Sequence, residues 1–297
     1  MDGAPMTSRF SIVIPWRHRR ELAKTLKVNA PWFDRYAAEV IVVNCGGDPD
    51  EAAALIDAHP IPGVRQVLLP AASFCKALAC NLGAWCSSSE LLFFLDTDIV
   101  VRTDVFSAAA NLLEQRRCFV KIRTVRELKP QVDPATRFLK EQVSSWRMVS
   151  TTGQRATLHF YTQGDGSRCG SGLLLLKKSD LISVGGFNAG LQGWGFEDLD
   201  LHIRLQFLAR LRPHALGETI HLTHGDHVRH VTASSRAENY RLNMMACFEN
   251  YSQQQLQGTY AQDVETWSSQ LREIGSPPPA PLEPAAHPAA AIAPGQN

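Results

Sequence analysis

The chain contains 297 residues, of which 44% are hydrophobic, and its 30 basic and 29 acidic side chains leave a formal net charge of +1. This length allows a large buried core, whereas the balanced charge offers no electrostatic attraction for nucleic acid or for an anionic membrane. No run approaches the ~18 apolar residues of a membrane-spanning helix, and the N-terminus lacks an apolar signal core. We therefore expect no nucleic-acid partner and no integral membrane segment.

Seven cysteines are scattered through apolar segments, and no two of them form a CxxC pair. This spacing predicts buried thiols in a reducing compartment rather than a zinc cluster. We therefore expect a cytoplasmic location.

Short apolar runs alternate with helical segments through the first hundred residues. We predict strands at 10–15, 40–43, 64–69 and 91–95, and helices around 22–26, 52–58 and 71–86. This alternation predicts a parallel α/β sheet, in which ligands bind beyond the carboxyl ends of the strands. Neither GxGxxG nor GxxxxGK[ST] is present, which argues against a Rossmann-type dinucleotide site and a P-loop.

Polar loops follow the first two predicted strands. Pro15 ends the first strand, and Arg17 belongs to the basic run WRHRR behind it. Such a run is typical either of a solvated helix start or of an anion contact where a strand meets a loop. Asn44 and Asp48 lie in the turn after the second strand, and Lys76 lies on the third predicted helix.

Asp96-Thr97-Asp98 directly follows the apolar run LLFFL. Alternate residues of an extended chain share a face, so both carboxylates could point to one site. Two hard oxygen ligands at the lip of a sheet suit Mg²⁺ or Mn²⁺ holding a diphosphate. The alternative is an ordinary polar turn at a strand end, but the α/β context favours the metal site.

The second half of the chain is less regular. We predict strands at 120–125 and 173–176, helices at 179–184 and 236–251, and a partly helical excursion over 130–147. Residues 275–297 are rich in proline and alanine and have too little patterned apolar content to pack. We therefore expect one folded domain over 9–265 and a disordered tail over 275–297.

The stretch GWGFEDLD at 193–200 crowds three carboxylates behind a tryptophan held between glycines. The helical period of the following residues places Glu197 and Asp198 in the first turn of a helix. One carboxylate there is explained by helix capping, but two adjacent like charges exceed what capping needs. The alternative is a sugar site, in which Trp194 offers an apolar plate and Gly193 leaves room for the ligand.

Four histidines lie within ten positions, in the sequence HLTHGDHVRH. A single histidine is most often structural, but a cluster downstream of a carboxylate pair favours at least one metal ligand. Alternation along a strand would separate His221 from His224, so both can reach one ion only if the strand ends or bends between them. We favour His224 and place His221 second.

These features in this order resemble a glycosyltransferase of the GT-A fold. FSIVIP, EVIVVNCGGD and the segment from FCKALAC to LLFFLDTDIVV resemble the nucleotide-sugar half of glycosyltransferase family 2, here residues 9–118. The segment from GSGLLLLKK to GWGFEDLDLHIRL, within residues 165–235, is similar to the acceptor and metal half of β-1,4-galactosyltransferases, polypeptide N-acetylgalactosaminyltransferases and bacterial chondroitin polymerases. The similarity covers roughly residues 9 to 230.

The resemblance implies a single catalytic domain with a mostly parallel central sheet flanked by helices. It also implies a metal-dependent, inverting transfer of a hexose or N-acetylhexosamine from a nucleotide sugar, expected to be a UDP-sugar. The acceptor would be a hydroxyl group of a glycan, a peptide or a small molecule. The cofactor would be Mn²⁺ or Mg²⁺.

The resemblance further implies a role for each matching residue. Asp198 would be the general base, with Glu197 hydrogen-bonded to substrate, and Trp194 with Gly193 would contact the acceptor sugar. The metal would be bound by Asp98 and His224, with Asp96 and His221 as further ligands. The donor would contact Pro15, Arg17, Asn44, Asp48, Lys76, Asp96, Thr97 and Asp98. Asn44 stands where the family usually has an aspartate, and Asp48 is expected to compensate in binding uracil.

Two alternatives are left open. A haloacid-dehalogenase-type phosphotransferase has the nucleophile motif DxDx[TV], which residues 96–100 fit, but that fold places the motif on its first strand and three strands precede it here. A non-catalytic sugar-binding relative would be favoured if the metal and base carboxylates lay apart in the fold.

Overall fold

In the computed structural model, which describes residues 10–129, 140–225 and 228–274, the strands join into one 11-stranded sheet. The strand order is β11-β3-β2-β1-β4-β9-β6-β10-β5, with the hairpin β7–β8 attached through β9. The predicted tail at 275–297 lies outside the described residues. No helix among the described residues is long and apolar enough to cross a membrane.

The first part of the sheet is parallel, as predicted. Its strands are β1 (Phe10–Trp16), β2 (Glu39–Cys45), β3 (Val64–Leu69) and β4 (Leu91–Phe94). Its connecting helices are α1 (Glu21–Arg35), α2 (Pro49–Asp57) and α3 (Lys76–Cys86). Strands β3, β2, β1 and β4 pair in parallel. The helix predicted over 71–86 begins only at Lys76, because residues 70–75 form an extended connection that brings the helix start to the strand ends.

The second part of the sheet is mixed, so the expectation of a mostly parallel sheet holds for the first part only. Its elements are β5 (Ile99–Val101), α4 (Val105–Gln115), β6 (Cys118–Glu127), β9 (Arg168–Lys177), α5 (Lys178–Ser183), α6 (Glu197–Phe207) and β10 (Arg212–His221). Strand β9 is antiparallel to both β4 and β6, whereas β10 is parallel to β6. A short turn joins β8 to β9, so these two consecutive strands also pair antiparallel.

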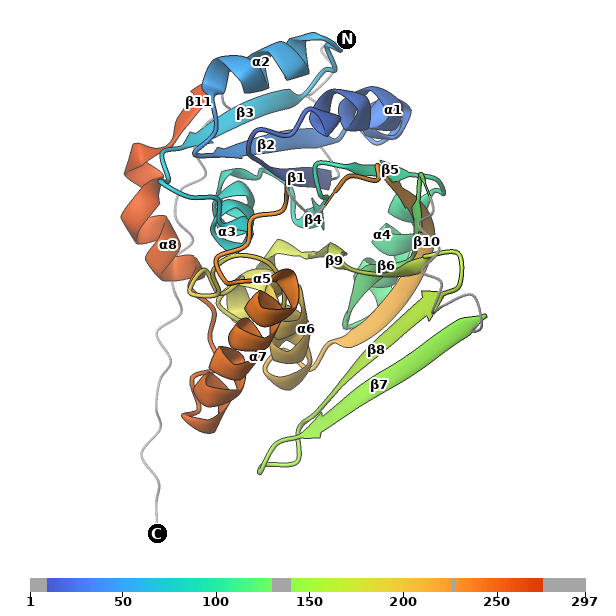
Figure 1. Ribbon diagram of the computed structural model, residues 1–297, viewed down its shortest axis with the longest axis vertical. Coiled ribbons are helices and arrows are strands. Elements are labelled where there is room, and N and C mark those ends of the chain that lie inside the picture. Colours follow the sequence, from blue (N-terminus) through green and yellow to red (C-terminus); the bar gives the residue numbers. More distant parts are fainter. Residues whose placement is uncertain (1–9, 130–139, 226–227, 275–297) are drawn as a thin grey trace.

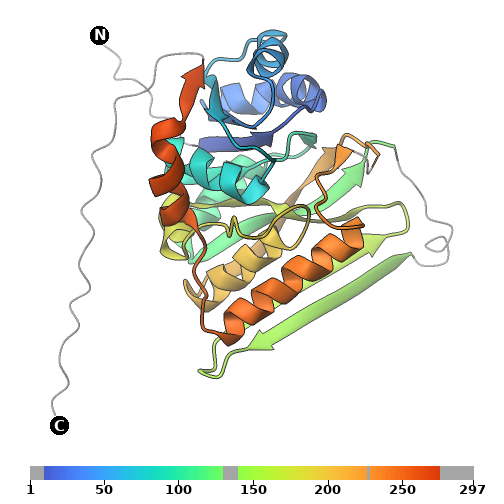
Figure 2. The same cartoon turned by 60° about the vertical axis from the view of Figure 1, so that its left-hand side comes forward.

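A long hairpin replaces part of the helical excursion predicted over 130–147. Its strands are β7 (Glu141–Val149) and β8 (Arg155–Gln163), and residues 130–139 lie outside the described part. The prediction was wrong for 141–147, which belong to β7. Trp146 packs against Phe160, and Met148, two residues further on, packs against the apolar cluster that includes residues of α6. Helices α6 and α7 (Arg236–Ser252) lie along this hairpin (Figure 2).

The last described residues lie at the edge of the sheet next to β3. Helix α8 (Tyr260–Trp267) packs on α3, the short 3-10 helix η3 (Ser268–Gln270) follows, and β11 (Arg272–Ile274) pairs antiparallel with β3. The folded part therefore reaches beyond residue 265. Figure 1 shows α8 in red beside α3.

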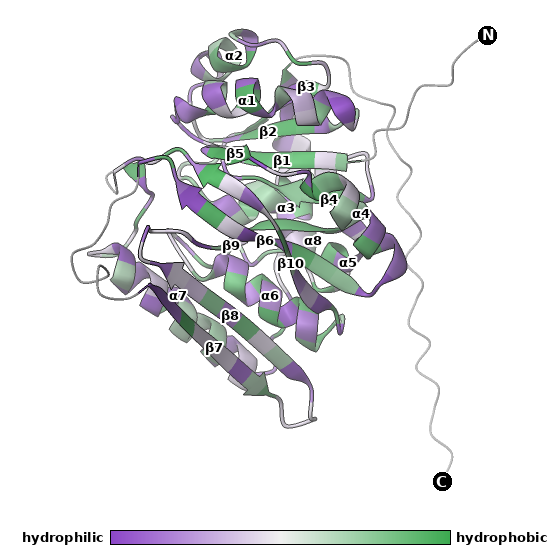
Figure 3. Cartoon of the chain, turned by 90° about the vertical axis from the view of Figure 1, so that its right-hand side faces the viewer, coloured by the Kyte–Doolittle hydropathy of each residue, from purple (hydrophilic) through white to green (hydrophobic). Residues whose placement is uncertain are grey.

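Helices cover both faces of the sheet and divide the core into layers. One apolar cluster joins the strands to α1 and α4, and a second joins them to α3, α5, α6 and α8. The apolar character of β1 and β2 is visible as green in Figure 3. This architecture leaves the carboxyl ends of β1, β4, β6 and β10 together at one edge, where the loops meet.

Candidate functional site

A cavity of about 700 Å³ opens where these strand ends meet. Its wall is formed by the end of β1, the loop after β4, the middle of β9, the first turn of α6 and the end of β10. Of the residues predicted to bind donor, six line this cavity: Pro15, Arg17, Lys76, Asp96, Thr97 and Asp98. Segments more than 200 positions apart in the sequence therefore contribute to one site.

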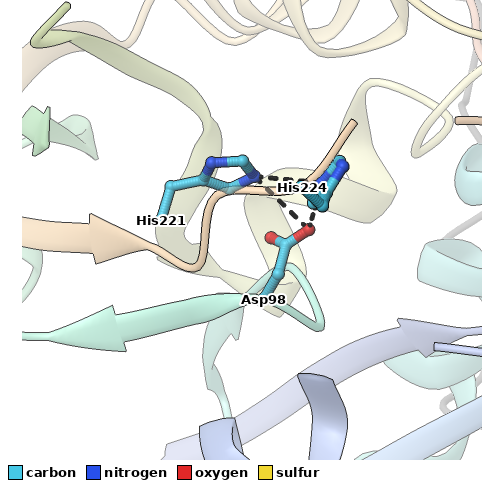
Figure 4. A group of neighbouring side chains, drawn as sticks. All are labelled: Asp98, His221 and His224. Carbon is cyan, nitrogen blue, oxygen red and sulfur yellow. Dashed lines mark hydrogen bonds and ion pairs between the residues drawn. The ribbon is translucent and has the colours of Figure 1, made fainter. Parts of the chain in front are cut away.

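Asp98, His221 and His224 form a tight group on one side of the cavity (Figure 4). Their ligand atoms all lie within 4.8 Å of one another. His224 Nε2 is 3.1 Å and His221 Nε2 is 3.5 Å from Asp98 Oδ2. Strand β10 ends at His221, opposite Ile99 of β5, and the chain then turns so that His224 returns to Asp98. The strand therefore ends between the two histidines, which allows both to reach one point.

A second layer of residues orients His221. Glu127 Oε2 accepts a hydrogen bond from His221 Nδ1 at 2.6 Å and another from the Thr223 hydroxyl at 2.9 Å. Arg168 forms an ion pair with Glu127. Burial lowers the pKa of His221, but the hydrogen bonds to Asp98 and Glu127 outweigh burial and raise it to about 9. Because Nδ1 is engaged by Glu127, Nε2 is the nitrogen directed at Asp98.

The carboxylate of Asp98 is buried and surrounded by cationic groups. Arg19 Nη2 lies 2.8 Å from Asp98 Oδ2. Burial raises the pKa of Asp98, but hydrogen bonds from the two histidines and the charge of Arg19 hold it well below its ordinary value. Asp98 is therefore a carboxylate at neutral pH, and together with two imidazole nitrogens it makes a donor set that fits a divalent cation.

Asp96 lies outside this group of ligands. Residues 97 and 98 form a turn, with Ile99 N–H donating to the Asp96 carbonyl at 3.2 Å, so the extended geometry expected for Asp96-Thr97-Asp98 is wrong. Asp96 Oδ1 instead pairs with Lys76 Nζ at 2.9 Å. The two aspartates line one cavity but have different partners.

Asp198 and Glu197 begin α6, as predicted, and face the cavity. Phe196 at the N-cap has a φ of 73° and makes no side-chain cap hydrogen bond. Lys76 Nζ lies 3.2 Å from Asp198 Oδ2, so this lysine bridges Asp96 and Asp198. The other oxygen of Asp198 and Oε2 of Glu197 are buried without a hydrogen-bond partner in the described part of the chain. Both residues line the cavity, and each keeps one carboxylate oxygen without a donor from the described part of the chain.

Burial controls the proton affinity of this acid pair. It raises the pKa of Asp198, against the opposing effect of the Lys76 ammonium. Burial and the adjacent Asp198 also raise the pKa of Glu197 to about 7. Raised carboxyl pKa values make these groups better proton acceptors, which is typical of a general base.

The third carboxylate of the stretch has a structural role. Asp200 points away from the cavity and is almost completely buried. It forms an ion pair with Arg204 at 2.7 Å and accepts a hydrogen bond from the Tyr251 hydroxyl at 2.6 Å. Arg204 also donates to the carbonyl groups of Val184 and Gly186. This network fixes α6 against α7 and the loop before it.

Trp194 lines the cavity, whereas Gly193 does not. The guanidinium groups of Arg236 and Arg229 lie 4.4 and 5.7 Å from the centre of the Trp194 ring. Gly193 has a φ of 75°, and an added Cβ would approach Asn239 Oδ1 to 2.1 Å. Gly193 therefore serves the fold of the loop, while Trp194 contributes an apolar surface to the cavity.

Asn44 and Asp48 do not line the cavity. The buried Asn44 side chain accepts a hydrogen bond from Gly47 N–H at 2.8 Å and so closes the turn after β2. Asp48 is the N-cap of α2 and accepts from the N–H groups of Asp50 and Glu51. The Asp48 carboxylate is therefore engaged at the start of α2. This geometry gives no support to the expectation that Asp48 replaces Asn44 in binding uracil.

Several residues of the site were not identified from the sequence. Arg19 belongs to the basic run that suggested an anion contact, but its ion pair with Asp98 joins positions 79 apart. Glu127, which binds His221, and Arg168, which pairs with Glu127, belong to no local motif. Their roles depend on long-range pairing of β6 with β9 and β10.

Comparisons with known proteins identify the family and the fold. A family model described as "Glycosyltransferase like family 2" matches residues 11–214. Chondroitin sulfate synthase 3 of Mus musculus is 26% identical over 171 residues, and that of Homo sapiens is 27% identical over 175 residues. Each match covers 56% of this chain and 18% of the relative, so the chain spans less than a fifth of their length.

A solved structure of GalNAc-T7 with UDP, GalNAc and Mn²⁺ has a similar fold. Its TM-score is 0.50 at 13% identity, over 83% of this chain and 48% of that chain. The likeness supports the GT-A fold expected from the sequence.

Proposed function

The chain belongs to the glycosyltransferase-like family 2, and on this premise we propose that it transfers a hexose or N-acetylhexosamine from a UDP-sugar to an acceptor hydroxyl with inversion. The observation that carries the proposal is the shared cavity. In it, Lys76 pairs on one side with Asp198 and on the other with Asp96, which belongs to the same loop as Asp98. A base for the acceptor and a binding site for the diphosphate are thereby brought together. The haloacid-dehalogenase alternative is set aside by the family match.

The donor side of the proposal rests on positive charge. Arg17, Arg19 and Lys76 line the cavity beside the loop after β4, and cationic groups bind diphosphate oxygens through charge-assisted hydrogen bonds. UDP is supported by its presence in the GalNAc-T7 structure of similar fold. We assign Pro15 and Thr97 to the same donor wall, because both line the cavity next to these residues.

We assign divalent-cation binding to Asp98, His221 and His224. Two imidazole ligands favour a first-row transition ion such as Mn²⁺ over Mg²⁺, which prefers oxygen ligands alone. Bound there, the cation would neutralise negative charge on the departing diphosphate. Glu127 holds the His221 ring in place, and Asp96 stays outside the ligand set as a partner of Lys76.

Asp198 is the proposed general base. Its carboxylate accepts the acceptor's hydroxyl proton while that oxygen bonds to the anomeric carbon, and the bond from that carbon to the diphosphate oxygen breaks with its electron pair leaving on the diphosphate. Glu197 hydrogen-bonds the acceptor beside it. The apolar surface of Trp194 favours a sugar as acceptor, with peptide or small-molecule hydroxyl groups as the alternatives.

A thermal-shift panel of UDP-sugars, each with and without Mn²⁺, tests the donor and metal sites together. We expect one UDP-sugar to stabilise the protein only with Mn²⁺, and Asp98→Ala to abolish that shift. Asp57→Asn, which removes an exposed carboxylate at the end of α2, should leave the shift unchanged. No shift with any UDP-sugar would contradict the proposed donor. The non-catalytic alternative would be supported if a UDP-sugar stabilised the protein with Mn²⁺ but no UDP were released when sugar acceptors were added.

A further inference from the structure

A second pocket of about 700 Å³ lies at the other end of the sheet. Its lining residues are Arg116, Arg117, Arg210, Arg212, Pro213 and His214. Arg116 and Arg117 follow α4, Arg210 lies between α6 and β10, and Arg212 is the first residue of β10. We call this group the arginine pocket.

The sheet places the arginine pocket far from the catalytic cavity. Arg212 begins β10 opposite Cys118 at the start of β6, whereas Glu127 at the end of β6 contacts His221. Strand β6 has ten residues and is therefore about 30 Å long. The arginine pocket is thus a separate site and not an extension of the cavity.

Hydrogen bonds to the backbone join the two chain segments that carry the four arginines. Arg212 N–H donates to the Arg117 carbonyl at 3.1 Å, which joins the two strand starts. Arg117 Nη2 donates to the Ala209 carbonyl at 2.7 Å, which joins the end of α6 to the end of α4. Arg210 has a φ of 54°, an uncommon conformation for a residue with a side chain. The turn is therefore built in a way that keeps these positively charged side chains close.

The local structure does not neutralise this charge. No acidic residue is among the residues that line the pocket. The C-terminal ends of α4 and α6 supply roughly half a negative charge each. Burial raises the pKa of Asp180, and the positive charges of Lys177 and Arg117 lower it. The carboxylate of Asp180 therefore interacts with Lys177 as well as with Arg117. Even with Glu114 of α4 counted, the four guanidinium groups outnumber these negative charges, so the pocket keeps a net positive charge.

We propose that the arginine pocket binds an anionic saccharide carrying sulfate or carboxylate groups. Planar guanidinium groups bind such oxyanions through paired hydrogen bonds, and the volume lies within the range of small-molecule sites. No large apolar side chain lines the pocket, so it lacks the apolar residues with which interfacial helices insert into a membrane. Because the chain belongs to a glycosyltransferase family, we choose a glycan as the anion. The proposal does not depend on the donor, the metal or the base assigned above.

The experiment measures binding of a sulfated dextran oligosaccharide to the full chain by fluorescence anisotropy at fixed salt. Unsulfated dextran of equal length serves as the neutral probe, and saturating UDP with Mn²⁺ competes for binding at the catalytic cavity. We expect the double variant R210Q/R212Q to weaken the UDP-insensitive binding at least tenfold. The matched variant R102Q/R272Q removes two exposed arginines elsewhere and should change it less than twofold.

Other outcomes would overturn the proposal. Equal weakening in both double variants would mean a general charge effect, and complete competition by UDP would place the sulfated chain in the catalytic cavity. Binding of phosphatidylserine vesicles that needs Arg210 and Arg212, without binding of the sulfated oligosaccharide, would mean a membrane contact. If R210Q/R212Q fails to fold by circular dichroism, R116Q, which alters an exposed residue after α4, carries the same test with at least threefold weakening expected.

Discussion

At the scale of single residues, the absence of a side chain at Gly172 shapes the proposed base. A Cβ added there would come within 2.4 Å of Asp198 Oδ2 and 2.8 Å of Lys76 Nζ. Gly172 lines the cavity on β9. The strand backbone therefore approaches the carboxylate and ammonium so closely that only glycine fits.

We predict that Gly172→Ala lowers the transfer rate at least tenfold, which corresponds to about 1.4 kcal/mol. The added methyl group must displace Asp198 or Lys76 from the observed pairing. Gly190→Ala is the matched control, because Gly190 lies outside the cavity and its added Cβ meets only the flexible Asn188 side chain at 3.0 Å. Initial rates of UDP release measure both variants. An unchanged rate in Gly172→Ala would contradict the proposed role of this pairing.

His202 illustrates a buried histidine that acts on stability. Its Nε2 lies 2.9 Å from the Ser171 carbonyl, and its ring packs edge-on against Phe119. Burial, together with the charge of Lys121, lowers the pKa of His202 to about 3. The unfolded chain protonates near 6.5, so the folded state loses stability as pH falls from about 6.5 towards 3.

We predict that His202→Gln reduces the pH dependence of stability within this window. The loss due to His202 approaches 1.4 kcal/mol per pH unit at most, and Gln keeps a donor for the Ser171 carbonyl without titrating. Urea unfolding at pH 7 and pH 5 measures the free energy of unfolding of both proteins. Equal losses between the two pH values in both proteins would show that His202 does not titrate as described.

At the scale of elements, α6 matters because its first turn carries the acid pair while its middle is tied to α7. The Tyr251 hydroxyl of α7 donates a hydrogen bond to Asp200 Oδ1 at 2.6 Å. Arg204, on the same helix, holds the loop that precedes α6 through two carbonyl groups. The position of Asp198 in the cavity therefore depends on a buried network one turn further along the helix.

We predict that Tyr251→Phe destabilises the protein by about 1.5–3 kcal/mol, the range for a hydrogen bond to a charged group. Burial and the charge of Asp200 raise the pKa of Tyr251, so its hydroxyl stays a donor. Tyr240→Phe serves as control, since burial alone, with no hydrogen bond to a described residue, raises the pKa of Tyr240. Thermal unfolding compares the two. A melting temperature equal to that of the parent protein in Tyr251→Phe would contradict the network.

The elements differ in how well their sequence predicts them. Apolar runs between turn residues located β1 to β4 closely, because those strands are buried on both faces and read as continuous hydrophobic segments. The β7 strand is mostly exposed, and its apolar residues Val143, Trp146, Met148 and Val149 do not alternate strictly with polar ones, so its period of two was hidden. The order of β9 between β4 and β6 is likewise set by pairing, which no local pattern encodes.

At the scale of the whole molecule, the fold converts separate motifs into one site. The sequence predicted Asp98, His221, His224, Asp198 and Trp194 as site residues from local spacing and from the family resemblance, and all five line the cavity or the ligand group within it. It could not predict that Lys76 bridges Asp96 and Asp198, or that Glu127 orients His221. Those contacts join positions 94 and 122 apart along the chain.

The most direct test of the proposed chemistry is the rate of sugar transfer by Asp198→Asn. Using the UDP-sugar selected by thermal shift, we expect this variant to bind donor with a Kd within twofold of the parent protein. Transfer should fall by a factor of about 10² to 10⁴, the contribution of a general base, while Asp57→Asn keeps the parent rate. Retention of more than a tenth of the parent transfer rate by Asp198→Asn would contradict the assignment of Asp198 as the base.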